Sequence, residues 1–247
     1  MVFPEFLGKM QTTSPRVFFG ACLIALASSA ARAEPTVAAL APEALAAPVA
    51  PDARWHDSFE AFAAADKAHA PEPGGVVFVG SSSIRLWKDL EQQFDDSQMI
   101  VKRGFGGSRM SDCANYVGRL VVPYKPHLVV VYAGDNDLAE GRSPQEVLAS
   151  FRRFVAGVRK ALPETRIAYL SIKPSPRRAA LMPAMRETNA LIAQYSKAQP
   201  NLDYIDVFSK MLDAEGRPRS ELYRADALHL NADGYALWKT VISAHLR

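Results

Sequence analysis

The sequence of 247 residues contains only two cysteines, Cys22 and Cys113. Two cysteines exclude a fold built on a disulfide framework and a zinc site built on cysteine ligands. A large excess of one charge is also missing, because 29 Lys and Arg residues face 26 Asp and Glu residues. The basic residues are scattered along the chain, which argues against the clustered basic surface of a nucleic-acid-binding protein.

Low-complexity sequence and internal repeats are lacking as well. The chain has 14 Gly and 17 Pro, and 49% of its residues are apolar while 22% are charged. This balance is typical of globular proteins and excludes disordered, collagen-like and coiled-coil chains. No Gly-Lys-Ser/Thr sequence is present, which excludes a phosphate-binding P-loop.

The N-terminal segment has no apolar run of the roughly 20 residues that a membrane-spanning helix needs. A shorter apolar run covers residues 17–30, follows two basic residues and leads into Ala-Arg-Ala at positions 31–33. These are the three parts of a secretory signal peptide. We therefore predict a signal peptide over residues 1–33 and an exported protein, periplasmic or secreted. A retained membrane anchor and a lipoprotein signal at Cys22 are the alternatives.

The segment after the predicted signal is rich in Ala and Pro and has no aromatic residue. It covers residues 34–53 and is predicted to be a disordered tether. Residues 54–247 then form the domain proper, which is long enough to bury a sizeable core. The exported chain would keep only Cys113, so it could form no intrachain disulfide.

Five short apolar segments alternate with helical patterns in this domain. Strands are predicted at residues 75–79, 98–103, 127–132, 166–172 and 202–207. Helices are predicted at residues 55–67, 110–120, 143–161, 181–198 and 231–245. This alternation predicts an α/β fold with a parallel sheet and helices on both of its faces. Ligands of such sheets bind beyond the carboxyl ends of the strands, so chemistry is expected in the segments that follow them.

Polar or glycine-rich segments follow the first three predicted strands, and another precedes the last predicted helix. They are Gly80-Ser81-Ser82-Ser83-Ile84, Gly104-Phe105-Gly106-Gly107-Ser108, Gly134-Asp135-Asn136-Asp137 and Asp226-Ala227-Leu228-His229. Each segment alone is a weak signal, because serines often cap helices and glycine pairs often form turns. Their joint occurrence at strand ends points to a shared active site.

The residue types in these segments suit acyl transfer. A serine hydroxyl is a poor nucleophile until a base removes its proton. His229 can be that base for Ser82, and Asp226 can fix the imidazole tautomer and stabilise its charged form. The backbone N–H groups of Ser82 and Gly107 and the amide of Asn136 could then bind the oxyanion. The row of serines leaves Ser83 as a second candidate for the nucleophile.

The four segments resemble the four sequence blocks of the SGNH hydrolases, also called GDSL-type esterases and lipases. Those blocks supply Ser, Gly, Asn and His in this order, matched here by Ser82, Gly107, Asn136 and His229, with Asp226 as the acid. The resemblance covers the chain from about residue 75 to the C-terminus. It implies a flavodoxin-like, three-layer α/β/α sandwich around five parallel strands.

The chain departs from the family pattern at two positions. Ser81 stands where the family's Gly-Asp-Ser opening has its acid, and Lys102 stands where an asparagine is often found. Neither position belongs to the triad, so activity is expected to survive both changes. Two other patterns fail: the Gly104-x-Gly106 segment lacks the third glycine of a dinucleotide fingerprint, and Gly80-x-Ser82 lacks the last glycine of an α/β-hydrolase elbow.

The resemblance and the signal peptide together predict an exported serine esterase for small acyl esters, with acetylated carbohydrate as the preferred class. A lipase or thioesterase of the same family is one alternative, and a catalytically silent module that binds glycan or protein is another. No metal, organic cofactor, nucleic-acid partner or stable membrane insertion is expected. A metal site formed by Asp135 and Asp137 with Asp226 and His229 is the competing possibility.

Basic residues near the blocks have two interpretations each. Arg85 is predicted to bind substrate, or else to pair with a carboxylate. Arg109 is predicted to bind an anionic or sugar substrate, or else to be a surface charge. The segment 173–178 (Lys-Pro-Ser-Pro-Arg-Arg) follows the fourth strand and would either shape the substrate groove or form a basic surface tip.

Overall fold

The computed structural model describes residues 52–94 and 99–246. These residues all belong to one compact unit, Ala46–Arg247. The predicted signal peptide, residues 1–33, lies outside the described residues, and so does the predicted tether up to residue 51.

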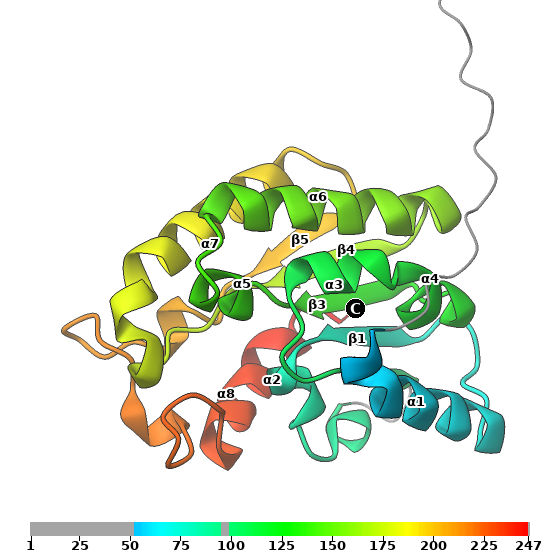
Figure 1. Cartoon of the computed structure of the whole chain (residues 1–247), viewed down its shortest axis with the longest axis horizontal. Helices are drawn as coiled ribbons and strands as arrows, with labels where there is room; N and C mark the ends of the chain where they lie inside the picture. The colour runs from blue at the N-terminus through cyan, green and yellow to red at the C-terminus, as the bar shows by residue number, and fades with distance from the viewer. Residues whose placement is uncertain (1–51, 95–98, 247) are drawn as a thin grey trace, which may run out of the picture. The chain divides into compact units, whose positions relative to one another are not determined.

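A five-stranded parallel sheet lies at the centre of this unit (Figure 1). Its strands are β1 (Val76–Gly80), β2 (Ile100–Gly104), β3 (Leu128–Tyr132), β4 (Arg166–Leu170) and β5 (Leu202–Ile205). Their order in the sheet is β2-β1-β3-β4-β5. The predicted five-stranded parallel α/β sandwich is therefore confirmed. The next two strands along the chain, β2 and β3, lie on opposite sides of β1, and such a switch point opens a crevice at the carboxyl ends of the strands.

The inner strands β1 and β3 are apolar and buried on both faces, as a sheet covered by helices on each side requires. In β1, Val77 and Val79 belong to one buried cluster, whereas Val76 and Phe78 belong to the other. Buried side chains of the first cluster come from α1 (His56–Ala68), α3 (Met110–Asn115), α4 (Val117–Leu120), α5 (Asp135–Ala139), α6 (Pro144–Ala161) and α7 (Met182–Lys197). Those of the second cluster include residues of α2 (Ser82–Arg85) and α8 (Ala232–Ser243).

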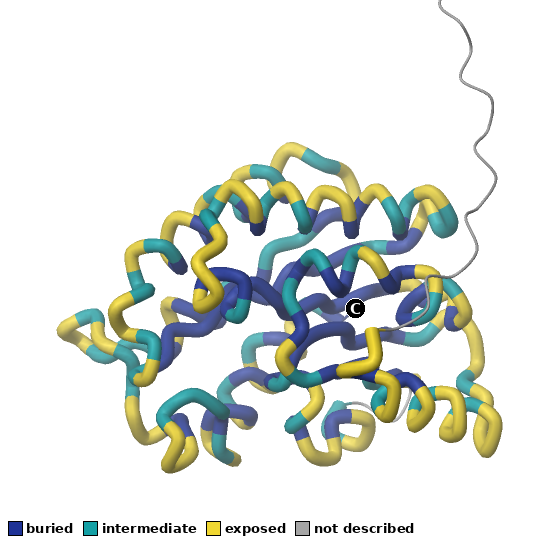
Figure 2. The backbone as a smooth tube through the Cα atoms, in the orientation of Figure 1, coloured by how far each residue is buried: buried dark blue, intermediate teal, exposed yellow. Residues whose placement is uncertain are grey.

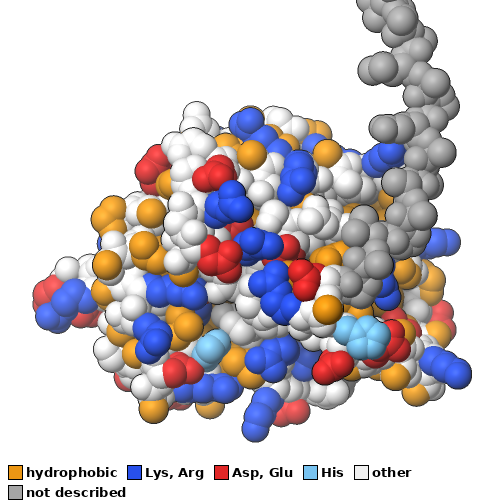
Figure 3. Space-filling model, viewed as in Figure 1, with side chains coloured by type: hydrophobic (Ala, Val, Ile, Leu, Met, Phe, Trp, Pro, Cys, Tyr) orange, Lys and Arg blue, Asp and Glu red, His pale blue; other side chains and the backbone are white. Residues whose placement is uncertain are grey.

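Short 3-10 helices connect several of these elements. They are η1 (Ala53–Trp55), η2 (Leu90–Gln92), η3 (Val122–Tyr124), η4 (Pro176–Leu181), η5 (Ser209–Met211) and η6 (Ser220–Leu222). Figure 2 shows the strands buried and the outward helix faces exposed. On the face drawn in Figure 3, basic and acidic side chains are interspersed.

The helix predicted at residues 110–120 is divided into α3 and α4 by a break at Tyr116 (φ −106°, ψ 16°). The ring of Tyr116 packs edge-on against Phe59 and Trp55, with centroids 5.1 and 6.2 Å away. This aromatic cluster with α1 accompanies the break, and the local sequence gave no sign of it. Within the described residues, no helix combines the length and the apolar character needed to cross a membrane.

Candidate active site

Three side chains form a hydrogen-bonded chain beyond the carboxyl end of the sheet. Oγ of Ser82 lies 3.1 Å from Nε2 of His229, and Nδ1 of His229 lies 2.7 Å from Oδ2 of Asp226. An ionised carboxylate can only accept, so Nδ1 carries the hydrogen and Nε2 is left to accept the serine hydroxyl. A hydroxyl, an imidazole and a carboxylate in this order make an activated serine nucleophile.

Ser82 is the first residue of α2, which begins directly after β1. The helix lies so close to β2 that a Cβ atom on Gly104 would overlap the backbone nitrogen of Arg85. Glycine at this position therefore permits the turn that presents Ser82. Ser83 is buried, and its carbonyl accepts a hydrogen bond from the hydroxyl of Tyr235. Of the two serines, it is thus Ser82 that meets His229.

Asp226 and His229 lie in one turn just before α8. Oδ1 of Asp226 accepts the backbone N–H groups of Leu228 and His229, both at 2.9 Å. Ala227 between them has a left-handed backbone (φ 57°), which a non-glycine residue adopts only when its surroundings hold it there. The backbone hydrogen bond from His229, together with the imidazole and Leu228, holds the pKa of Asp226 well below its ordinary value. Asp226 therefore stays ionised at any pH at which an esterase works.

Asn136 belongs to α5, directly after β3. Its Nδ2 donates to the carbonyl of Ser108 at 3.0 Å, and its Oδ1 accepts from Arg178 at 3.0 Å. The second N–H of the amide has no acceptor among residues 52–94 and 99–246. It is a free donor of the kind that an oxyanion hole needs.

Gly107 follows β2 and has a left-handed backbone (φ 74°) with open space where a side chain would stand. Its N–H and that of Ser82 have no backbone acceptor in the described part of the chain. Because β1 pairs with β2 on one side and with β3 on the other, the segments after these three strands are neighbours. The fold thus gathers Ser82, Gly107 and Asn136 at one edge of the sheet.

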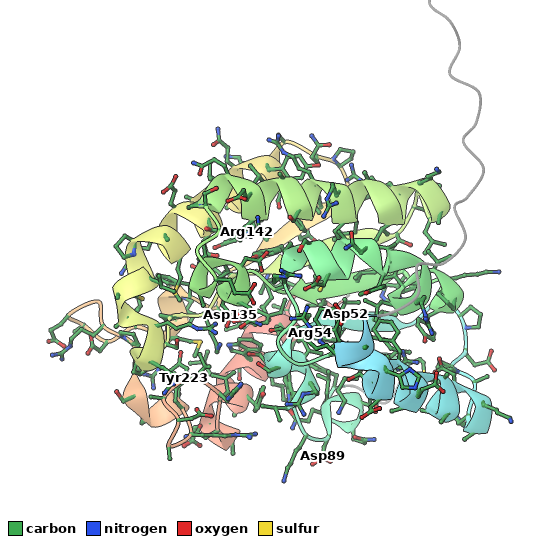
Figure 4. The ribbon with its side chains drawn as sticks, viewed as in Figure 1. Asp52, Arg54, Asp89, Asp135, Arg142 and Tyr223 are labelled. Carbon is green, nitrogen blue, oxygen red and sulfur yellow. The ribbon has the colours of Figure 1, made fainter. Side chains whose placement is uncertain are left out.

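A buried ion cluster lies beneath Asn136. Oδ2 of Asp135, labelled in Figure 4, contacts Nζ of Lys173 at 3.2 Å and the guanidinium of Arg178 at 3.0 Å. The side chains of Lys173 and Asp135 are only 1% and 5% exposed. Burial raises the pKa of Asp135, but the charges of Lys173 and Arg178 outweigh it and hold that pKa below its ordinary value. Burial also lowers the pKa of Lys173, against the attraction of Asp135.

This cluster corrects the interpretation of the segment 173–178 as a basic surface tip. Lys173 is fully buried and donates to the hydroxyl of Tyr132 at 3.2 Å, while Arg178 is half-buried. Within the segment 173–178, Arg177 alone is an exposed basic residue. The hydroxyl of Tyr223 donates to the carbonyl of Pro174 and so anchors the segment from the other side.

Asp137, the residue after Asn136 in α5, is also buried. Its Oδ2 accepts the backbone N–H of Met110 at 2.9 Å. Burial raises the pKa of Asp137 to about 6, in spite of this hydrogen bond. Asp135 and Asp137 therefore have protein partners of their own, and no group of three His, Cys, Asp or Glu residues in the described part of the chain is arranged to hold a metal ion.

The two arginines predicted to bind substrate lie in different environments. Arg85 is exposed, and its side chain covers Gly106, where a Cβ atom would lie 2.8 Å from the guanidinium Nε. Arg109 instead pairs with Asp112 at 3.0 Å and with Glu140 at 3.4 Å. Pairing with carboxylates, the alternative prediction for Arg85, occurs at Arg109 instead.

Sequence reasoning missed the contacts that hold Asn136, which come from Arg178 and Ser108. The only sequence signal was the position of 173–178 after the fourth strand, which places it at the same edge of the sheet. Nothing local indicates that Lys173 turns inward or that Arg178 meets Asn136, because these partners are 38 and 42 residues apart.

Residues 75–237 match the GDSL-like lipase/acylhydrolase family. The chain belongs to this family. Membership supports ester hydrolysis as the general chemistry of this GDSL-like protein. A search of curated proteins found no match.

Solved structures share the fold of this GDSL-like protein. A presumed acylhydrolase from Bacteroides fragilis is 20% identical with a TM-score of 0.68, and the match covers 80% of this chain and 98% of that one. A GDSL-like lipase from Bacteroides thetaiotaomicron is 20% identical with a TM-score of 0.64, over 76% and 96% of the two chains. A mutant acetyl esterase with an acetate ion is 16% identical with a TM-score of 0.54, over 70% and 96%. At these identities the likeness concerns the fold alone.

Proposed function

We propose that this GDSL-like protein is an exported serine esterase that hydrolyses small acyl esters, acetyl esters of carbohydrates above all. The observation that carries the proposal is the chain from Ser82 Oγ through His229 to Asp226, with contacts of 3.1 and 2.7 Å. Family membership supports the reaction type, and the solved acetyl esterase supports acetate as an acyl group that this fold can handle.

In the first half of the reaction, Oγ of Ser82 attacks the ester carbonyl while Nε2 of His229 takes the hydroxyl proton. The carbonyl oxygen becomes an oxyanion, which the free N–H groups of Ser82, Gly107 and Asn136 bind. The bond to the alcohol then breaks, and the alcohol leaves with the proton from His229. The acyl group remains on Ser82 as an ester.

In the second half, water attacks the acyl group and gives a proton to Nε2 of His229. The same donors bind the second oxyanion. The bond to Oγ breaks, Ser82 recovers its proton from His229, and the free acid departs. Asp226 stays ionised throughout and stabilises the imidazolium in both halves.

A preference for short acyl chains is supported by the lack of apolar surface for a long one. Met99 is the only large hydrophobic residue exposed in the described part of the chain, and it lies just before β2, at the far end of the sheet from Ser82. A long acyl chain needs an apolar surface to leave water, at roughly 0.8 kcal/mol per CH₂ group. An acetyl group has little need of such a surface.

Arg85 is our candidate for contact with the rest of the substrate. It lies three residues after Ser82 and over Gly106, the neighbour of Gly107, and it forms no ion pair with another described residue. Its guanidinium is therefore available to a sugar hydroxyl or an anionic group. Arg109, already paired with Asp112, is the weaker candidate.

The test is hydrolysis of p-nitrophenyl esters from C2 to C12 by the purified domain, with Ser82→Ala as the inactive control and Ser83→Ala as the matched one. We expect the highest kcat/KM with the C2 ester. Ser82→Ala should show no hydrolysis, and Ser83→Ala should have a kcat/KM near that of wild type. A maximum at C8 or longer would favour a lipase. No turnover by folded protein would favour the silent binding module.

Export is tested separately. Expression of the full chain in a bacterial host, followed by fractionation and N-terminal sequencing, is expected to give periplasmic or secreted protein beginning at Glu34. A protein that keeps residues 17–30 and sediments with membranes would instead be anchored.

A further inference from the structure

We propose that Arg178 is a positioning residue that locks the carboxamide of Asn136 in the orientation needed for oxyanion binding. The inference rests on the proposed esterase function and adds to it a residue outside the four sequence blocks. The juxtaposition that carries it is the contact of Arg178 with Asn136 at 3.0 Å and with Asp135 at 3.0 Å.

Both polar atoms of the Asn136 carboxamide have a hydrogen-bond partner in the protein. Oδ1 accepts from the guanidinium of Arg178, and Nδ2 donates to the carbonyl of Ser108. A flipped amide would set its NH₂ group against the guanidinium, which can only donate, and its oxygen against the carbonyl, which can only accept. Arg178 and Ser108 thus leave a single orientation, with one N–H of Nδ2 still free for the oxyanion.

Arg178 itself is held by the buried ion cluster. Its Nη2 donates to Oδ1 of Asn136 while its Nη1 forms an ion pair with Oδ2 of Asp135, so one rigid, planar group holds both neighbouring side chains. Asp135 is held in turn by Lys173 at 3.2 Å. The backbone adds a further support, since the N–H of Arg177 donates to the carbonyl of Ala227 at 3.0 Å, in the turn between Asp226 and His229.

The cluster also places positive charge behind the oxyanion donor. Lys173 and Arg178 carry two positive charges against the one negative charge of Asp135. A cation on Oδ1 polarises the carboxamide and makes its N–H groups stronger donors, an effect that is large where water is excluded. Arg178 acts through Asn136, so its removal should slow the chemical step more than it weakens substrate binding.

The experiment compares Arg178→Met with Arg177→Met, which removes the same charge from the adjacent, exposed residue. Steady-state kinetics with p-nitrophenyl acetate are expected to show kcat lowered about 10- to 100-fold in Arg178→Met, a part of the 100- to 1,000-fold typical of losing a whole oxyanion donor. KM should change less than about threefold. Arg177→Met should keep both constants near wild type.

A double-mutant cycle with Asn136→Ala separates positioning from a general structural effect. Arg178→Met should lower kcat little further in the Asn136→Ala background, because the group on which it acts is gone. An equal loss in both backgrounds would overturn the proposal, and so would wild-type kcat in the single variant. Arg178→Lys keeps the charge but not the fork, and it should recover only part of the loss. If Arg178→Met does not fold, Arg178→Lys takes its place in the cycle.

Failure of this inference differs from failure of the proposed function. If the wild-type protein hydrolyses the ester and Ser82→Ala does not, the function stands whatever Arg178 does. If neither protein hydrolyses any ester of the series, the function fails, and the positioning role falls with it.

Discussion

Asp226 and His229 are three residues apart in one partly exposed turn, whereas Asn136 depends on partners from two distant segments. The proton-transfer side of the site (Ser82, Asp226, His229) is organised by local backbone hydrogen bonds to a carboxylate that is 44% exposed. The oxyanion side is organised by buried charges that cross the carboxyl ends of β3 and β4.

The difference follows from what each side must do in the proposed mechanism. The imidazole has to gain and lose a proton, and partial exposure to water tolerates both charge states. The oxyanion donors must keep one orientation while charge develops on the substrate, and rigid surroundings supply this without reorganisation. We therefore expect substitutions on the first side to affect activity alone, and substitutions on the second to affect both activity and stability.

The largest expected effect is that of His229→Ala. Loss of the base should lower kcat/KM for p-nitrophenyl acetate by about 10⁴-fold or more, as in other serine triads. The side chain of His229 is 24% exposed and belongs to neither buried cluster, so the melting temperature should stay close to that of wild type. Retention of more than a tenth of the activity would show that another group is the base.

Asn136→Ala should have a smaller effect on rate and a larger one on stability. We expect kcat to fall about 100- to 1,000-fold with the loss of one oxyanion donor. Arg178 and the carbonyl of Ser108 would also lose their partner, at a cost of about 1–3 kcal/mol in the free energy of unfolding. Urea denaturation of Asn136→Ala and of His229→Ala measures this difference in stability. Equal free energies of unfolding for the two variants would contradict the prediction.

The smallest expected effect concerns Asp137 and the pH dependence of stability. Because burial raises its pKa to about 6 from an ordinary value near 3.8, the folded state binds the proton more tightly than the unfolded state. The contribution of Asp137 to the free energy of unfolding is therefore most favourable at low pH and is lost as pH rises from about 4 to about 6. Asp137→Asn keeps an acceptor for the N–H of Met110 but cannot ionise.

Relative to wild type, Asp137→Asn should thus gain stability as pH rises, by about 1–3 kcal/mol between pH 4.5 and 7.5. Urea unfolding of both proteins at pH 4.5, 6 and 7.5 gives this difference, in which the contributions of all other groups cancel. A difference that does not change with pH would mean that the pKa of Asp137 is not raised.

The sequence by itself determined the five strands, the longer helices and the position of the site beyond the carboxyl ends of the strands. Apolar runs predicted the five strands to within a few residues, because strands covered on both faces need apolar side chains throughout. The helix predicted at residues 143–161 is α6, and its start is set by the local hydrogen bonds of a capping box between Ser143 and Glu146. The parallel order of strands and helices then placed the residues after the strands at one edge of the sheet, where Ser82 and His229 meet.

Only the tertiary structure decided which partner each charged side chain would take. Lys173, in a segment predicted to shape the substrate groove or to form a basic surface tip, is buried on Asp135. Arg109, predicted to bind substrate or to be a surface charge, is paired with Asp112. The break at Tyr116 likewise accompanies an aromatic cluster with Phe59, 57 positions earlier in the sequence. Local sequence specifies turns, caps and periodicity, but the choice among several carboxylates and cations depends on distances that exist only once the sheet and its helices have packed.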